Sequence, residues 1–209
     1  MKTILMTLIL VIVNHFLWAQ VGVGTLTPDP NVALDVNGKI KISGSGQITK
    51  QGNVLTSDAN GVASWEGAVA FAADGAVTDN LNLSGGSPTK VLFESENYDL
   101  SNNLSGSIFT VPTHGIYQIN AKVSWIAPSS FFLVDATLQL IRNGVETTIG
   151  QNAAYVDTEM IASNIINIDL ELQSGDQLYV LIQHSSGTSK SVSTDKGLCR
   201  FSGKMSVKL

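Results

Sequence analysis

The chain has 209 residues, of which 14% are charged and 44% are hydrophobic, with 19 glycines, 5 prolines and a single cysteine. Its net charge of −5 argues against a nucleic-acid partner, because phosphate binding requires a positive surface. One cysteine excludes a disulfide framework within the chain and a zinc site made of several cysteines. Low charge with many small residues favours strands joined by tight turns over a helical bundle.

The first 19 residues predict a secretory signal peptide. Lys2 supplies a positive charge, a mostly apolar run occupies 4–18, and Ala19 is a small residue for cleavage before Gln20. The alternative is a membrane anchor, but polar residues interrupt the run, which is shorter than the roughly 20 residues that a span needs. Cleavage removes only Lys2 among the charged residues and leaves 11 basic and 17 acidic residues, a net charge of −6. We therefore expect a secreted or cell-surface protein with no membrane span in the mature chain.

Residues 20–67 predict short strands that lack a core of their own. The segment is rich in glycine and contains few large apolar side chains. A monomer of about fifty such residues cannot bury enough apolar surface to offset its chain entropy. We therefore expect this segment to share a core with copies of itself.

Two turn motifs organise the segment. Residues 33–42 read as two short strands around Asn37-Gly38, a dipeptide typical of hairpins or tight bends. Residues 54–65 repeat this plan, and the side chain of Asp58, two residues before Asn60, is placed to bond into the turn. Both stretches therefore predict paired strands joined by tight turns.

Much of the segment resembles the N-terminal stalk of secreted tail-fibre-like proteins, which are common in Bacteroidota-type bacteria. The motifs that carry this resemblance are VGVGT at 21–25 with Pro28, ALDVNG at 33–38 and VLTSDANGVASW at 54–65. The resemblance covers most of residues 21–67, and it implies an intertwined trimeric β stalk.

Residues 68–89 predict a linker. The first part, 68–77, is small and apolar, and a Ser-Gly-Gly-Ser-Pro loop follows at 84–88. We therefore place the domain boundary between 67 and 90.

From Lys90 onward the chain predicts a regular series of strands. Tyr117, Trp125 and the odd-numbered residues between them share one face of a strand, and the polar even-numbered residues share the other. Arg142-Asn143-Gly144 is a hairpin signal. Further strands are expected at 107–110, 131–141, 145–149, 166–172, 178–183 and 201–209. Strands at this spacing, with no helical period, predict an all-β sandwich or barrel.

Residues 90–209 are similar to the globular head of complement C1q, in the C1q and tumour necrosis factor (TNF) superfamily. The motifs are Tyr98-Asp99, GSIFTVPTHGIY at 106–117, LIRNG at 140–144, LELQSGDQL at 170–178 and FSGKM at 201–205. Ile119 and Ala121 depart from the family, which usually has aromatic residues there. The resemblance implies a ten-stranded jelly-roll β-sandwich that packs as a compact homotrimer, here behind a short N-terminal β stalk instead of a collagen segment.

The residues that match this family signature are expected in the core or at the threefold contact. They are Phe109, Pro112, Gly115, Tyr117, Gly175, Asp176, Phe201 and Gly203. Pro112 ends a strand and Gly115 permits the turn into the next one. Gly203 is placed to let a neighbouring backbone approach closely.

Candidates for chemistry are few, and we assign no catalytic residue and no cofactor. His114 is read as a turn residue, and a triad built on His184 carries no signal because serine and aspartate are abundant. Asp157 and Glu159 lie in a loop that a trimer would present three times, which makes calcium the one weak candidate metal. The alternative, which we favour, is an ordinary solvated loop.

Three basic residues are candidate ligand contacts: Arg142, Lys190 and Lys196. The alternative for them is ordinary surface charge. Trp125 is expected in the core and, less favoured, as a platform for a sugar. Cys199 is expected as a buried free thiol, with an intermolecular disulfide as the alternative, since secretion permits oxidation.

These observations predict a secreted, non-enzymatic homotrimer with a β stalk and a C1q-like head, which binds an extracellular protein or glycan for adhesion or recognition. The alternatives are a purely structural surface or fibre component and, less favoured, a carbohydrate-active enzyme. The enzyme would need a clustered catalytic pair, and the sequence offers none with convincing spacing.

Overall fold

The computed structural model describes residues 21–42, 53–58, 60–77, 84–126, 132–156 and 162–209. The signal peptide expected at 1–19 and the calcium candidates Asp157 and Glu159 lie outside these residues. Contacts divide the chain into two units, residues 1–47 and residues 48–209. All regular elements in the described ranges are strands, β1 to β15. None of the described residues belongs to a helix that is long and apolar enough to cross a membrane.

The first unit contains a two-stranded parallel sheet instead of the expected hairpin. Strand β1 (Val21–Val23) pairs with β2 (Leu34–Val36), with Val21 opposite Leu34. The prediction of two strands around Asn37-Gly38 is wrong, because residues 39–42 form no strand. The backbone N–H of Asn37 donates to the carbonyl of Val23 at 2.9 Å, so the chain closes onto β1 at this point instead of turning back on β2.

The second turn motif forms the hairpin that the sequence predicts. Strand β3 (Val54–Ser57) pairs antiparallel with β4 (Ala63–Glu66). The carboxylate of Asp58 accepts hydrogen bonds from the backbone N–H groups of Asn60 at 2.9 Å and Val62 at 2.8 Å. The side chain of Asp58 therefore holds the turn closed, as its position before Asn60 indicates.

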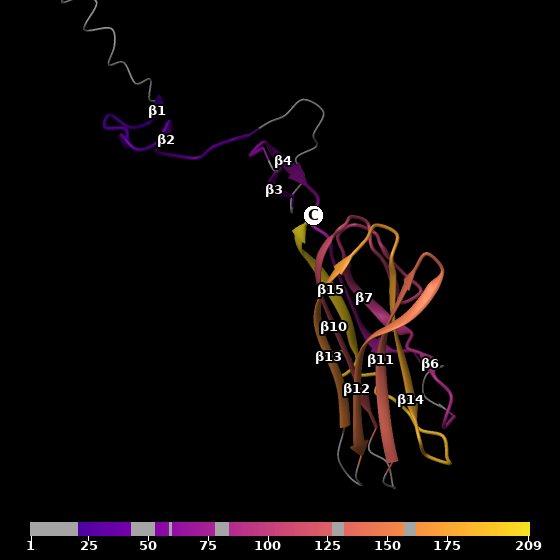
Figure 1. Cartoon of the computed structure of the whole chain (residues 1–209). Helices are drawn as coiled ribbons and strands as arrows, with labels where there is room; N and C mark the ends of the chain where they lie inside the picture. Colours follow the sequence, from indigo (N-terminus) through magenta and orange to yellow (C-terminus); the bar gives the residue numbers. More distant parts are fainter. Residues whose placement is uncertain (1–20, 43–52, 59, 78–83, 127–131, 157–161) are drawn as a thin grey trace, which may run out of the picture. The chain divides into compact units, whose positions relative to one another are not determined.

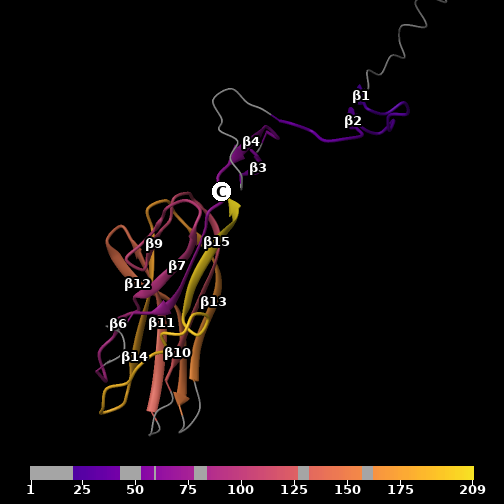
Figure 2. The ribbon, with the colours of Figure 1, turned by 180° about the vertical axis from the view of Figure 1, so that it is seen from behind.

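The rest of the second unit is a sandwich of two sheets (Figures 1 and 2). One sheet has the order β13-β10-β15-β5-β7, and the other has the order β12-β11-β14-β9-β8, with β6 also paired to β14. The strands are β5 (Ala70–Ala76), β6 (Thr89–Lys90), β7 (Phe93–Asp99), β8 (Leu104–Ser105), β9 (Ile108–Thr110), β10 (Gly115–Trp125), β11 (Phe132–Arg142), β12 (Val145–Val156), β13 (Ala162–Leu172), β14 (Gln177–His184) and β15 (Arg200–Lys208). The fold class is all-β, as expected.

The core lies between the two sheets. Along β10, the residues from Tyr117 to Trp125 at odd positions are at most 3% exposed, which confirms the predicted alternation. The ring of Phe109 on β9 stacks on Phe71 of β5, with centroids 4.2 Å apart, and Phe201 on β15 meets Phe71 edge-on at 4.9 Å. Burial of each such ring stabilises the fold by about 1.5–3 kcal/mol. These aromatic contacts therefore join strands that are far apart in the sequence.

Strand β5 corrects the predicted linker. Residues 70–76 lie between β15 and β7 in the middle of a sheet, and Phe71 is fully buried. The backbone N–H of Met205 donates to the carbonyl of Val69 at 2.9 Å, so the sandwich already begins there. The prediction failed because a strand of small residues that packs tightly in a core has the same composition as a linker.

Two glycines in the five-stranded sheet allow close approach. A Cβ on Gly203 would lie 2.6 Å from Cδ1 of Ile119 and 2.7 Å from Cε1 of Phe71, so its neighbours are side chains and not the backbone that we expected. A Cβ on Gly115 would lie 2.4 Å from the carbonyl oxygen of Val207. The register of β10 against β15 shifts just after this point. Gly115 therefore permits a tight strand contact, and its role is not that of the turn residue we expected.

Candidate functional site

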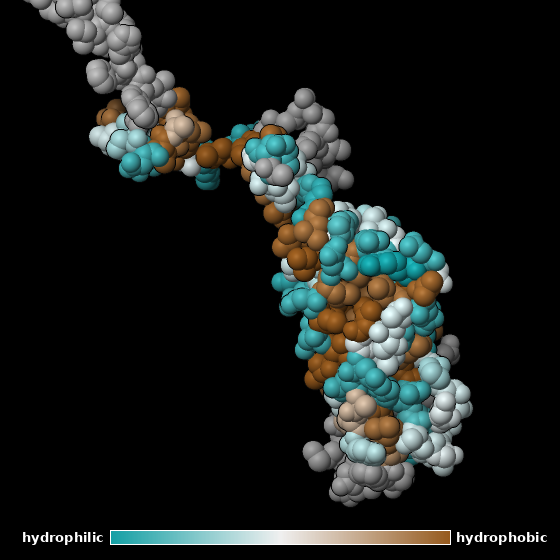
Figure 3. Space-filling model, in the orientation of Figure 1, coloured by the Kyte–Doolittle hydropathy of each residue, from teal (hydrophilic) through white to brown (hydrophobic). Residues whose placement is uncertain are grey.

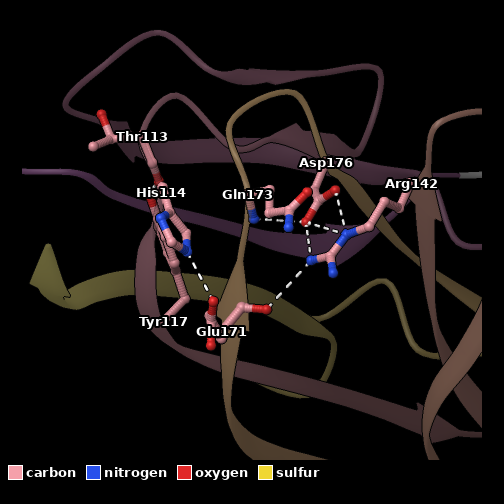
Figure 4. A network of polar contacts seen from close by, with 7 residues as sticks. All are labelled: Thr113, His114, Tyr117, Arg142, Glu171, Gln173 and Asp176. Carbon is pink, nitrogen blue, oxygen red and sulfur yellow. Dashed lines mark hydrogen bonds and ion pairs between the residues drawn. The ribbon is translucent and has the colours of Figure 1, made fainter. Parts of the chain in front are cut away.

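A polar network ties together two turns and the end of β11 (Figure 4). Its centre is Asp176, which is 3% exposed and follows the turn between β13 and β14. The carboxylate of Asp176 accepts hydrogen bonds from Nε of Arg142 at 3.0 Å, from Nη2 of Arg142 at 2.5 Å and from the backbone N–H of Gln173 at 2.8 Å. The guanidinium and the carboxylate thus form a forked ion pair, a geometry that fixes both groups.

The network determines the charge state of its members. Burial opposes the ionisation of Asp176, but the hydrogen bonds from Arg142 and from the backbone of Gln173 outweigh it, so the pKa of Asp176 is lowered. The hydrogen bond to Asp176 raises the pKa of Arg142. Burial raises the pKa of Tyr117, and its hydrogen bond to Thr113 offsets this only in part. The Arg142–Asp176 pair therefore remains charged over the physiological pH range.

The same network holds the turn before β10 against the turn before β14. The backbone N–H of Val111 donates to the carbonyl of Asp176, and the N–H of Gly175 donates back to the carbonyl of Val111, both at 2.8 Å. The hydroxyl of Ser174 donates to Pro112, and that of Tyr117 donates to Thr113 at 2.7 Å. Several of the family-signature residues therefore meet here and act as a structural clamp.

The three basic candidates do not form one site. Arg142 and Phe132 lie at opposite ends of β11, roughly 30 Å apart, since a strand rises about 3.3 Å per residue. The ammonium of Lys190 sits 4.9 Å from the centre of the Phe132 ring, so it lies at the end far from Arg142. Lys196 is exposed in the segment before β15. Their role as ligand contacts stays a prediction, and the guanidinium of Arg142 is already paired with Asp176.

The histidines and Trp125 have structural partners. His114 contacts Glu171 on the surface, with 2.8 Å between Nε2 and Oε1. His184 is buried edge-on against Trp125 and Phe132, and its Nδ1 accepts the backbone N–H of Ser186. Trp125 is fully buried and donates through Nε1 to Asn164 at 2.8 Å, which confirms the expectation of a core residue.

Cys199 is fully buried and is not part of a disulfide in the structure. Burial raises the pKa of its thiol, and a hydrogen bond to the carbonyl of Ser124 opposes this only in part. Because thiolates are the reactive form, a buried thiol with a raised pKa is a poor partner for an intermolecular disulfide. The structure thus agrees with the buried free thiol that the sequence favours.

A polar hollow on the outward face of the six-stranded sheet was missed by our reading of the sequence. Its cavity of about 280 Å³ is lined mainly by polar side chains: Asp135, Thr137, Gln139, Thr148, Gln151 and Gln183. We call it the Asp135 hollow. The available signal was the alternation along β11, where Asp135, Thr137 and Gln139 lie between the buried apolar residues. Across the described part of the chain, no group of three or more metal-ligating side chains occurs.

Comparisons with known proteins show what fold this is. No protein-family model matches the chain, and no curated protein matches it in sequence. Among solved structures, murine APRIL is 17% identical, with a TM-score of 0.50 over 68% of this chain and 99% of its own. The TNF protein Eiger of S. frugiperda is 16% identical, with a TM-score of 0.51 over 69% of this chain and 94% of its own. The globular domain of the zebrafish complement 1qA protein is 15% identical, with a TM-score of 0.50 over 68% of this chain and 99% of its own.

The sandwich is a C1q/TNF-like jelly roll. Several of these structures are aligned over almost their whole length, so the match describes a complete domain. At such low identities the likeness concerns the fold alone, and it transfers neither ligand nor assembly to this chain. The C1q/TNF-like head is thus established as an architecture.

Proposed function

We propose that the protein is a secreted homotrimer that recognises or adheres to an extracellular protein or glycan through its C1q/TNF-like head. The N-terminal run typical of a signal peptide supports secretion. The resemblance of the first segment to trimeric stalks and of the second to trimeric heads supports the assembly.

The observation that carries this proposal is the exposure of apolar side chains in the stalk. None of the described residues between 21 and 66 is buried. Leu26, Ile40 and Val62 are all more than 60% exposed, and apolar residues reach the surface of this segment in Figure 3. Exposed apolar surface in short, two-stranded sheets indicates a partner, and copies of the same segment are the simplest one.

Trimerisation suits recognition by weak contacts. Closed rotational symmetry places three identical heads on one stalk. Simultaneous binding of two or three heads converts later contacts into intramolecular ones, which raises the overall affinity without any new contact. A trimer therefore makes a weak head–ligand interaction useful at a surface.

The assembly is tested by light scattering on the exported protein. We expect a mass of three chains, and a mass of one chain would contradict the trimer. Leu34→Asn in the stalk should weaken assembly, because it removes an apolar side chain that is 56% exposed in the single chain. Val145→Asn, at a comparably exposed site on the head, is the matched control and should leave the mass unchanged.

Recognition is tested by screening the trimer on glycan and cell-surface arrays. Reproducible, saturable binding is expected. A trimer that binds nothing would instead favour the second candidate, a purely structural surface or fibre component. The paired strands of the stalk favour that candidate, since two-stranded sheets leave edges open to further pairing. A carbohydrate-active enzyme remains the least favoured alternative.

A further inference from the structure

The carboxylate of Asp135 is buried, and one of its oxygens is unsatisfied. Asp135 is 5% exposed, and its Oδ2 accepts hydrogen bonds from Nε2 of Gln151 at 2.7 Å and of Gln183 at 3.3 Å. Its Oδ1 is buried and has no hydrogen-bond partner among the described residues. An unsatisfied buried polar atom costs about 1–3 kcal/mol, and more when it is charged. Such an atom in a native protein indicates a role or a missing partner.

Two hollows adjoin this carboxylate. The Asp135 hollow has a volume of about 280 Å³, and a second cavity of about 230 Å³ shares Asp135 and Gln183 with it. The larger volume lies near the lower end of the range for small-molecule sites, which is about 300–1,000 Å³. The unsatisfied group thus stands where two small spaces meet.

The walls of the hollow offer both donors and acceptors. The amide of Gln139 donates to the hydroxyls of Thr137 at 2.8 Å and of Thr148 at 2.9 Å, so these side chains are held in place. Gln151 and Gln183 each use one N–H on Asp135, and an amide has a second N–H and a carbonyl oxygen in addition. A ligand for this site must therefore donate to a carboxylate and also exchange hydrogen bonds with amides.

An aromatic side chain lies on the same face of the sheet. In the ladder between β11 and β12, Asp135 is opposite Ala153 and Leu133 is opposite Tyr155. Directly opposed residues in an antiparallel pair project to the same side. Tyr155, which is 68% exposed, therefore presents a ring beside the polar hollow. A polar pocket next to an exposed ring suits a ligand with hydroxyl edges and an apolar face.

We propose that the Asp135 hollow is the site at which the head binds a neutral, hydroxyl-rich ligand, namely a saccharide. A sugar hydroxyl donates to the carboxylate of Asp135 while its oxygen accepts from an amide of Gln151 or Gln183. This inference rests on the proposed recognition function and names the site and the ligand class for it. It differs from the sequence-based expectation, which placed ligand contacts at Arg142, Lys190 and Lys196.

A metal ion fits the hollow less well. Calcium takes six to eight oxygen ligands. Asp135 is the one carboxylate in the described lining of the larger cavity, and the described residues contain no cluster of three or more metal-ligating groups. An organic ammonium ion remains the main competitor, because it also donates to a carboxylate, and the experiment includes it.

The test is saturation-transfer difference NMR on the whole mature protein. The probes are galactose, mannose, fucose and N-acetylglucosamine, together with calcium chloride and butylamine as competitors. We expect at least one saccharide to bind and to resist displacement by calcium or butylamine. Asp135→Asn should weaken that binding at least tenfold. This variant should keep its fold, because asparagine has the same shape and the amides of Gln151 and Gln183 can rotate to pair with it.

The matched control is Asp169→Asn, which removes an exposed carboxylate on β13 in the other sheet and should leave binding unchanged. The proposal is overturned if none of the saccharides binds at millimolar concentration, if binding survives Asp135→Asn, or if only calcium or butylamine binds. If the Asp135→Asn variant fails to fold, the site is instead located from the NMR chemical shifts of backbone amides. A saccharide should then shift the signals of Thr137, Gln151 and Gln183 in the unaltered protein, and shifts confined to other residues would overturn the proposal.

The outcome separates this inference from the proposed function. If the trimer binds on the arrays and the Asp135→Asn variant binds equally well, the recognition function stands, but its site is not the Asp135 hollow. If a saccharide binds only when Asp135 is present, but the protein has the mass of one chain, the site stands and the trimer is contradicted.

Discussion

The segment that the sequence predicts as a stalk (21–66, called the stalk segment) and the C1q/TNF-like head (69–209) are both built from strands, yet they differ in where their apolar side chains lie. Strands of the stalk are three or four residues long and bury nothing completely. Strands of the head reach 12 residues and enclose aromatic rings between two sheets. The stalk segment follows local rules of turns and pairing, but among the described residues only those of the head form a core within one chain. Pairing alone therefore does not make a stable domain.

The largest expected effect comes from separating the two regions. A fragment of residues 68–209 should unfold cooperatively on heating, because it contains the whole described core. A fragment of residues 20–67 at low concentration should lack ordered β structure, because its strands bury no apolar side chain on their own. Circular dichroism measures both. A stalk fragment that folds as a monomer would contradict the contrast drawn between the regions.

Removal of one large core side chain should come next in size. Phe71→Ala should lower the free energy of unfolding of the head by about 3–5 kcal/mol, since the ring is fully buried against Phe109 and Phe201. Urea unfolding of the fragment and of the whole chain measures this loss. Leu34→Ala in the stalk is the control and should leave the unfolding of the head unchanged.

Breaking the clamp around Asp176 should have a smaller effect. Arg142→Leu leaves a buried carboxylate without its charged partner and should cost about 1–3 kcal/mol in urea unfolding at neutral pH. The loss depends on pH because the pKa of Asp176 in the folded state lies below its ordinary value of 3.8. Its contribution is complete above pH 3.8 and is lost as the pH falls through the folded-state pKa. The difference between the two proteins should therefore shrink in strong acid, and a difference independent of pH would exclude the ion pair as its source.

The smallest expected effect is at Tyr179, on the outward face of β14. The hydroxyl of Tyr179 donates a hydrogen bond to the carboxylate of Glu146 at 2.5 Å. Burial and this carboxylate raise the pKa of Tyr179 to about 12. A raised pKa stabilises the fold below pH 10, and this contribution is lost as the pH rises from 10 through 12. In ultraviolet titration, Tyr179→Phe should lose the tyrosinate step near pH 12, whereas Tyr98→Phe should keep it.

Periodic and turn-forming sequences predicted much of the head. The alternation from Tyr117 to Trp125 identified a strand with one buried face because a sheet with one side in a core repeats every two residues. Asp58 and Asn60 identified the hairpin of the stalk because their turn is stabilised by local hydrogen bonds. The motif order identified the jelly roll, and the structural comparisons bear this out.

Features that depend on distant residues escaped the sequence analysis. Strand β5 looks like a linker because its small residues gain their burial from β15, which lies more than 100 residues later. The dipeptide Asn37-Gly38 permits a hairpin, but β2 pairs with the earlier strand β1 instead of with the residues after the dipeptide. The partner of Arg142 was not evident, because Asp176 lies 34 residues further along the chain. The Asp135 hollow is assembled from three strands, and a single strand shows only its alternation.

The position of β5 also determines how the head responds to tension. The stalk leads directly into this strand, which is hydrogen-bonded to β15 on one side and to β7 on the other. A pull between the N-terminal end of β5 and the opposite end of the head, near Arg200, acts along β5, while the hydrogen bonds run perpendicular to the strand. Under such a pull the two ladders must slip together in shear instead of opening one bond at a time. The same seven residues that resemble a flexible connector therefore join the segment before them to the interior of a sheet.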